Sequence, residues 1–456
     1  MTRQQPAYTL TAAEIVKTIR EGALTATGIV RSCFDRIEAL EPALAAWVTL
    51  DQKGAYAEAE RLDDEARRGR LRGPLHGVPF GVKDISFTRG IRTTGGSRAF
   101  ADFVPNYDAA TVARLKGAGA VLLGKAATAE FAFTDPAATR NPWNLEHTPG
   151  GSSSGSGVAV AARMCPIALG SQTGGSTIRR AANCGVVGFK PTYGRVSCHG
   201  MFPLAESYDR VGIFARTVAD AALVLGVISG YDPQDPNSLE VPEEDFTRAL
   251  AEWPKAPRIG LLGGFFHDTA TAETRAGIER LAALLERAGA RLEKVAPPPS
   301  TGSLVDDFLG KVAAEAASYH ERYFAERREL YGPNIAACVE RGLKTTAVEY
   351  LRQTRADLEF RRDIHALAAR FAALLESSTP APAPKGLAST GDFSFNSPFT
   401  MAGLPVIGLP SGLSAAGLPL GIQLVGAPLT EASLLGIART AEQAVAFNRT
   451  PTAVPA

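Results

Sequence analysis

Residues 150–192 read GGSSSGSGVAVAARMCPIALGSQTGGSTIRRAANCGVVGFKPT, with glycine–serine loops at 150–157 and 174–176 around a small apolar run. Glycine allows unusual backbone angles and lets a substrate approach the main chain closely. Upstream, the sequence GVPFGVKD at residues 77–84 places Lys83 at the end of a second apolar run. Serines on glycine turns, together with a lysine in apolar surroundings, are the groups that a Ser-Ser-Lys hydrolase requires.

The pattern around this stretch alternates between strands and helices. Strands are expected at 78–82, 120–123 and 258–262, and amphipathic helices at 109–118 and 274–288. This alternation predicts a three-layer α/β/α core. We expect residues 1–70 to form an N-terminal helical segment packed on a main domain of residues 71–456. A charged stretch rich in aromatic residues predicts a helical insertion at about 300–375 within that domain.

Composition excludes several classes of function. The chain has 456 residues, 45% of them hydrophobic and 21% charged, which is ordinary for a soluble globular protein. The formal net charge of +1 gives no electrostatic reason to bind nucleic acid or an anionic membrane. No apolar run has the roughly 18 residues of a membrane helix, and no secretory signal is visible. We therefore expect neither nucleic acid nor membrane as a partner.

The cysteine content indicates the compartment. Five cysteines, without a C-x-x-C pair, favour neither a disulfide framework nor a structural zinc site. A reducing cytoplasm fits this pattern best. We expect a cytoplasmic protein that needs no metal and no organic cofactor.

Two other meanings of the glycine-rich loops are disfavoured. Neither loop contains G-x-x-x-x-G-K-[ST], and neither is a G-x-G-x-x-G between a strand and a helix, so nucleotide binding is not indicated. Residues 151–155 formally match G-x-S-x-G, the nucleophile elbow of α/β-hydrolases. That elbow needs a strand before its serine, and residues 141–149 do not have a strand pattern.

A lysine base remains. A serine hydroxyl is a poor nucleophile until a neighbouring group takes its proton. Lysine can accept that proton only if burial or nearby charges lower its pKa well below about 10. Lys83 follows an apolar stretch that favours the neutral amine, although a lysine at a strand end can also simply reach water.

The whole pattern resembles the amidase signature family, over about 74–225 and again over about 379–442. Beyond the two loops and the Lys83 motif, further matching pieces are Gly124-Lys125, Glu130-Phe131, Ser207-Tyr208-Asp209, residues 215–220 and residues 417–426. The resemblance implies a central, mixed, twisted sheet flanked by helices. It also implies a Ser-cisSer-Lys mechanism that requires no cofactor.

The resemblance assigns roles residue by residue. Lys83 is the base, Ser152 after Gly150-Gly151 is the serine that relays the proton, and Ser176 after Gly174-Gly175 is the nucleophile. The oxyanion hole maps to the backbone N–H groups of Thr173, Gly174, Gly175 and Ser176, and Ser153 supports the site from behind. Three positions depart from the common pattern: Gln172 replaces an aspartate, Ser154 a glycine and Arg180 a proline. These departures leave the subfamily open.

The function expected first is free-standing hydrolysis of a small amide, anilide or carbamate, with a homodimer as one arrangement. The alternative is the amidase (A) subunit of a tRNA-dependent amidotransferase, which uses glutamine and passes ammonia to partner subunits. A degenerate scaffold protein is disfavoured because Lys83, Ser152 and Ser176 are all present. Phe131 and Phe133 are candidates for an apolar substrate pocket, or alternatively for the core.

Overall fold

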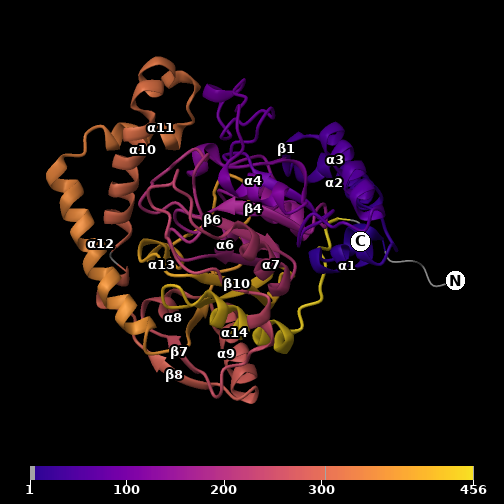
Figure 1. The fold of residues 1–456 in the computed structure, drawn as a ribbon. Helices are drawn as coiled ribbons and strands as arrows, with labels where there is room; N and C mark the ends of the chain where they lie inside the picture. The colour runs from indigo at the N-terminus through magenta and orange to yellow at the C-terminus, as the bar shows by residue number, and fades with distance from the viewer. Residues whose placement is uncertain (1–5, 303, 455–456) are drawn as a thin grey trace.

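A single mixed sheet of eleven strands crosses the molecule, in a computed structural model that describes residues 6–302 and 304–454 (Figure 1). The strand order is β1-β3-β2-β4-β6-β5-β10-β11-β9-β7-β8. The strands are β1 (Trp47–Leu50), β2 (Pro79–Lys83), β3 (Val121–Ala126), β4 (Ile167–Ser171), β5 (Val187–Lys190), β6 (Val211–Ala215), β7 (Arg258–Leu262), β8 (Arg291–Val295), β9 (Ala373–Ser377), β10 (Val406–Leu413) and β11 (Pro419–Val425).

The sheet is mixed, as expected. Strand β2 runs parallel to both β3 and β4, and β7 runs parallel to β8 and β9. The central pairs, β4 with β6, β5 with β6 and β10 with β11, are antiparallel. Every residue of β2, β3, β4, β5, β6 and β11 is buried, so both faces of the sheet are covered. This confirms the predicted α/β fold class.

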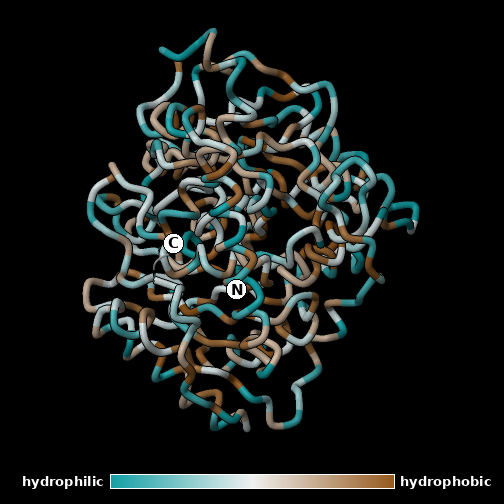
Figure 2. The backbone as a smooth tube through the Cα atoms, turned by 90° about the vertical axis from the view of Figure 1, so that its left-hand side faces the viewer, coloured by the Kyte–Doolittle hydropathy of each residue, from teal (hydrophilic) through white to brown (hydrophobic). Residues whose placement is uncertain are grey.

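Helices supply that cover. The α-helices are α1 (Ala12–Arg20), α2 (Ala26–Leu44), α3 (Gln52–Arg67), α4 (Ala110–Gly117), α5 (Ser154–Ala161), α6 (Ile178–Cys184), α7 (Val218–Ile228), α8 (Phe265–Thr269), α9 (Ala272–Arg287), α10 (Val305–Arg327), α11 (Pro333–Gly342), α12 (Ala347–Ala368), α13 (Ser397–Met401) and α14 (Glu431–Val445). Helices α5 and α6 contact each other, and α14 contacts both α7 and α9. Figure 2 shows hydrophilic segments along many of the outer loops.

The N-terminal segment contributes three helices and one strand. Thr11 and Glu14 form the expected capping box at the start of α1. The strand β1 was not anticipated: it pairs antiparallel with β3 and forms one edge of the sheet. The proposed division into residues 1–70 and 71–456 stays a prediction.

Residues 305–368 form the three helices α10, α11 and α12, which lie together at one side of the molecule (Figure 1). Their apolar residues join a buried cluster that also contains Phe131, Phe202 and Phe399. Within the described residues, no helix is both long and apolar enough to cross a membrane.

Candidate active site

Lys83 and the two serine loops converge at the carboxyl ends of neighbouring parallel strands. Lys83 is the last residue of β2, and β4 ends at Ser171, directly before the turn that carries Ser176. The register pairs Val82 with Leu169, so both strands end at the same edge of the sheet. The loop that carries Ser152 leads into α5, which contacts both β2 and β4.

Lys83 is positioned to act as a base. Its Nζ donates to Ser152 Oγ and to Ser171 Oγ, each at 2.7 Å, and the side chain is completely buried. Burial lowers the pKa of Lys83 well below its usual range. The charge of Asp209 opposes this shift, and the charge of Arg180 adds to it. The neutral amine that results can accept a proton from a hydroxyl group.

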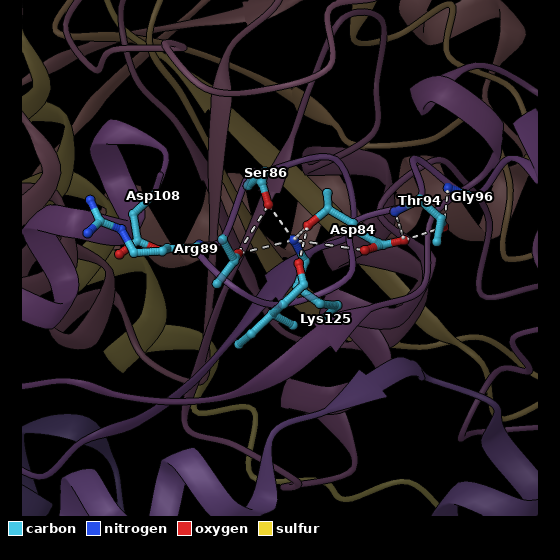
Figure 3. Close-up of polar contacts among 10 residues, drawn as sticks. Asp84, Ser86, Arg89, Thr94, Gly96, Asp108 and Lys125 are labelled. Carbon is cyan, nitrogen blue, oxygen red and sulfur yellow. Dashed lines mark hydrogen bonds and ion pairs between the residues drawn. The ribbon is translucent and has the colours of Figure 1, made fainter. Parts of the chain in front are cut away.

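A second buried lysine is held quite differently. Lys125 Nζ lies 3.8 Å from Asp84 Oδ1 and donates to Thr93 Oγ1 at 2.8 Å and to the Ser86 carbonyl (Figure 3). Burial lowers the pKa of Lys125 to about 7, against the attraction of Asp84. These contacts tie the chain after β2 to β3. Lys125 is therefore a structural cation, whereas Lys83 makes its hydrogen bonds to two hydroxyl groups.

The first loop holds Ser152 against Lys83. The peptide bond between Gly151 and Ser152 is cis. Ser152 O accepts the N–H groups of Ala129 at 3.0 Å and Ser154 at 2.8 Å. Gly155 is required for close packing, because a Cβ there would lie 2.0 Å from the Ala46 carbonyl oxygen.

Ser153 ties this loop to β4. Its Oγ donates to the Ser171 carbonyl at 3.1 Å and accepts the Ser171 N–H at 3.2 Å. Ser153 thus contacts the residue that shares Lys83 with Ser152. It lies where a residue supporting the site from behind is expected.

The second turn presents free backbone donors. Within the described residues, the N–H groups of Thr173, Gly174, Gly175 and Ser176 have no hydrogen-bond acceptor. Buried backbone donors are normally paired, so four consecutive free ones indicate a place for a negatively charged oxygen. This supports the expected oxyanion hole.

Gln172 holds this turn from behind and explains one departure from the family pattern. Its Oε1 accepts the N–H groups of Thr177 and Ile178, each at 2.9 Å. Its Nε2 donates at 2.9 Å to Thr400 Oγ1, which in turn donates to the Gly174 carbonyl at 2.9 Å. An amide can both accept and donate in this way, which an ionised aspartate cannot.

Ser176 opens onto a small cavity of about 40 Å³. Its lining combines the nucleophile turn with residues of α10 and of the loop before α13: Ala132, Phe133, Thr134, Thr173, Gly174, Gly175, Ser176, Arg179, Leu204, Phe308, Leu309, Val312, Thr390 and Phe393. Phe133 is among these residues. Phe131 is fully buried and packs against Phe202 and Tyr331 in the neighbouring aromatic cluster.

The structure joins one link of the expected proton relay. Lys83 and Ser152 are hydrogen-bonded, but no hydrogen bond within the described residues joins Ser152 to Ser176. Catalytic hydrogen bonds often tighten only when substrate is bound. In the part of the chain that the structure describes, no cluster of His, Cys, Asp or Glu could hold a metal ion.

Sequence reasoning missed the role of Ser171. The available signal was a hydroxyl residue that closes an apolar strand, next to the strand that ends at Lys83. It could be read only once β2 and β4 were known to be neighbours.

Comparison with known proteins places these features in a family. A family model described as Amidase matches residues 28–435. The chain is 37% identical to the amidase (A) subunit of the glutamyl-tRNA(Gln) amidotransferase of Carboxydothermus hydrogenoformans, over 97% of this chain and 98% of that protein.

Solved structures extend the comparison. The native peptide amidase from Stenotrophomonas maltophilia matches with a TM-score of 0.86 and 32% identity, over 98% of this chain and 99% of that chain. A structure described as an unexpected vestigial protein complex, which reveals the evolutionary origins of an s-triazine catabolic enzyme, matches with a TM-score of 0.91 and 30% identity. It covers 97% of this chain and 100% of that chain.

One expectation is wrong. The net charge led us to expect a small-molecule substrate and no nucleic acid, but the similar curated proteins are named as subunits of a tRNA amidotransferase. The net charge of one chain describes only its own average electrostatics. It carries no information about partner subunits or the substrate that an assembly handles.

Proposed function

This chain belongs to the amidase family and acts on carbon–nitrogen bonds, and we propose that it is the amidase subunit of a tRNA-dependent amidotransferase, releasing ammonia from glutamine. The observation that carries the proposal is 37% identity to the corresponding subunit of a glutamyl-tRNA(Gln) amidotransferase over almost the full length of both chains. The similarity to a structure described as a protein complex, at 30% identity, is consistent with such a role.

The reaction proceeds through an acyl-enzyme. Lys83, held neutral by burial, takes a proton from Ser152, which takes one from Ser176. Ser176 Oγ then bonds to the amide carbon, and the carbonyl oxygen becomes an oxyanion. The free N–H groups of residues 173–176 stabilise that oxyanion, and one such donor typically contributes about 3–4 kcal/mol.

Collapse of this intermediate breaks the carbon–nitrogen bond. The proton on Lys83 returns through Ser152 to the departing nitrogen, which leaves as ammonia from a primary amide. Water then adds to the ester on Ser176, giving up its proton along the same route. The second collapse frees the carboxylic acid and restores the Ser176 hydroxyl.

The cavity suits a short acyl group. It holds about 40 Å³ and is bounded by Phe133, Phe308 and Phe393. Arg179 lies in its wall and is almost fully buried; it donates from Nη2 to the Gly151 carbonyl at 2.5 Å. A side-chain amide such as that of glutamine is small enough for this opening.

A second candidate is free-standing hydrolysis of a small amide, anilide or carbamate. The observation that favours it is the structural match to a peptide amidase, which extends over 98% of this chain. The two candidates share Lys83, Ser152 and Ser176, and they differ in the amide that is cleaved and in the need for partner subunits.

The experiment compares substrates and partners with the same purified chain. Ammonia release from glutamine, aliphatic amides, p-nitroanilides and aryl carbamates is measured with the chain alone and with the other amidotransferase subunits of the same source. Glutamine hydrolysis that rises when those subunits are added supports the first candidate. Fast cleavage of small amides by the chain alone, with no effect of added subunits, refutes it in favour of the second. Ser176→Ala is the control for both.

A further inference from the structure

Three consecutive residues, 207–209, connect the helices α10 and α12 to the turn that carries Ser176. At the turn, the Thr173 hydroxyl donates to Asp209 Oδ1. The other oxygen, Asp209 Oδ2, accepts the backbone N–H groups of residues 204 and 205 at 2.8 and 3.1 Å. Asp209 therefore fixes the first residue of the oxyanion turn to a neighbouring loop.

On the opposite side, the same three residues are bonded to the helices. Ser207 donates to Glu315 of α10 through its N–H at 2.9 Å and through its hydroxyl at 2.7 Å. The Tyr208 hydroxyl donates to Asp357 Oδ2 of α12. Lys311 of α10 donates to the same oxygen at 3.1 Å. Two helices thus hold two consecutive residues of the segment.

These contacts are buried, which makes them hard to displace. Tyr208 is 1% exposed, Asp357 5% and Lys311 6%. Removing one partner from a buried, charged contact leaves an uncompensated group and is strongly destabilising locally. The Tyr208 ring also lies 5.0 Å from the ring of Phe308, which lines the cavity beside Ser176. The hydroxyl of Tyr208 and the wall of the cavity are therefore set by the same side chain.

We propose that Tyr208 and Asp357 are positioning residues for acylation: they hold residues 207–209 and, through Asp209 and Thr173, the oxyanion turn. The helices α10 and α12 then act on the reaction without touching the reacting atoms. The inference rests on the proposed role of Ser176 as nucleophile, and it is independent of which amide is the substrate. A reacting group displaced by about 1 Å can lose about 100-fold in rate.

The test measures the rate at which a fluorophosphonate labels Ser176, together with kcat and KM for an amide. Tyr208→Phe removes one hydroxyl and keeps the ring, so we expect labelling and kcat to fall about tenfold with KM little changed. Tyr331→Phe is the matched control. It removes the hydroxyl that pairs with His320 in the same helical layer, and it does not touch residues 207–209. Its rates should equal those of the wild type.

A double-mutant cycle distinguishes positioning from general destabilisation. If Tyr208 acts through Thr173, the effects of Tyr208→Phe and Thr173→Val on kcat should be less than multiplicative. Glu315→Gln, at the second contact, should also slow labelling and provides an independent variant should Tyr208→Phe fold poorly. Wild-type labelling rates in both Tyr208→Phe and Glu315→Gln, or fully multiplicative effects in the cycle, overturn the inference. Failure of the wild type to be labelled at Ser176 instead overturns the proposed nucleophile, and the inference with it.

Discussion

The two glycines before Ser176 should respond very differently to the same substitution. A Cβ at Gly175 would lie 2.5 Å from Asn396 Oδ1, whereas a Cβ at Gly174 would meet Phe393 Cδ2 at 3.3 Å. Ordinary contact begins at 3.4 Å, so Gly175→Ala demands a separation of about 0.9 Å and Gly174→Ala about 0.1 Å. Neither glycine needs a positive φ, so space alone distinguishes the two positions.

Asn396 cannot easily move away. It is 1% exposed, and its Nδ2 donates to the Ser378 carbonyl at 3.0 Å and to Gln423 Oε1 at 3.2 Å. The nucleophile turn must therefore shift, and its free N–H groups with it. A displacement of about 1 Å at reacting groups can cost about 100-fold in rate, which is the fall in kcat that we expect for Gly175→Ala. Phe393 is only half-buried and can give way, so Gly174→Ala should lose a few-fold at most.

The assay is single-turnover acylation together with steady-state kcat, on variants whose fold is checked by circular dichroism and thermal unfolding. Overpacking typically costs about 1–3 kcal/mol of stability, so Gly175→Ala should remain folded at room temperature. Equal losses in the two variants, or near-normal acylation by folded Gly175→Ala, would show that the turn is not a preorganised oxyanion site.

The remaining predictions concern the relay and the cofactor. Lys83→Ala should lower kcat by several orders of magnitude, and Lys83→Arg should not restore it, because arginine stays protonated at neutral pH; near-normal turnover by the arginine variant would exclude a base role. Since the neutral form of Lys83 is active and its pKa is lowered, kcat/KM should rise with pH through an apparent pKa below that of free lysine. The charge of Arg180 favours neutral Lys83, so Arg180→Met should move this limb to higher pH and Arg180→Lys should move it less; identical pH–rate profiles for wild type and Arg180→Met would contradict this. Ser152→Ala should lower kcat much more than it changes KM, yet less than Ser176→Ala does, and wild-type acylation by this variant would leave Ser152 a purely structural serine. Activity should survive exhaustive dialysis against EDTA, and loss that a divalent ion restores would refute the metal-free mechanism.

Several features of this protein follow from local sequence alone. Alternating apolar runs predicted an α/β core, and the capping box at Thr11 correctly marked the first helix. The glycine–serine loops and the GVPFGVKD motif were sufficient to identify the family and to select Lys83, Ser152 and Ser176 as candidates. These signals are readable because periodicity and turn chemistry depend on residues only a few positions apart.

Other features depend on contacts between distant parts of the chain. Lys83 and Ser152 are 69 positions apart, and their hydrogen bond exists because β2 and the α5 loop meet beside β4. The same neighbourhood gave Lys83 a second partner, Ser171, and placed Lys125 beside a carboxylate instead. Burial and strand order decide these outcomes, and neither is written in the spacing of residues along the chain.

The two phenylalanines proposed for the pocket show the same limit. Phe131 and Phe133 are two positions apart, yet only Phe133 lines the cavity beside Ser176, while Phe131 lies among buried aromatic rings. Residues 207–209 likewise looked like a family motif, and only the packing of α10 and α12 shows what they hold together. Local sequence determined which chemical groups this protein has and the kind of turn that presents each one. Tertiary structure decided which groups touch, because side chains remote in sequence meet only where the order and register of the strands bring them together.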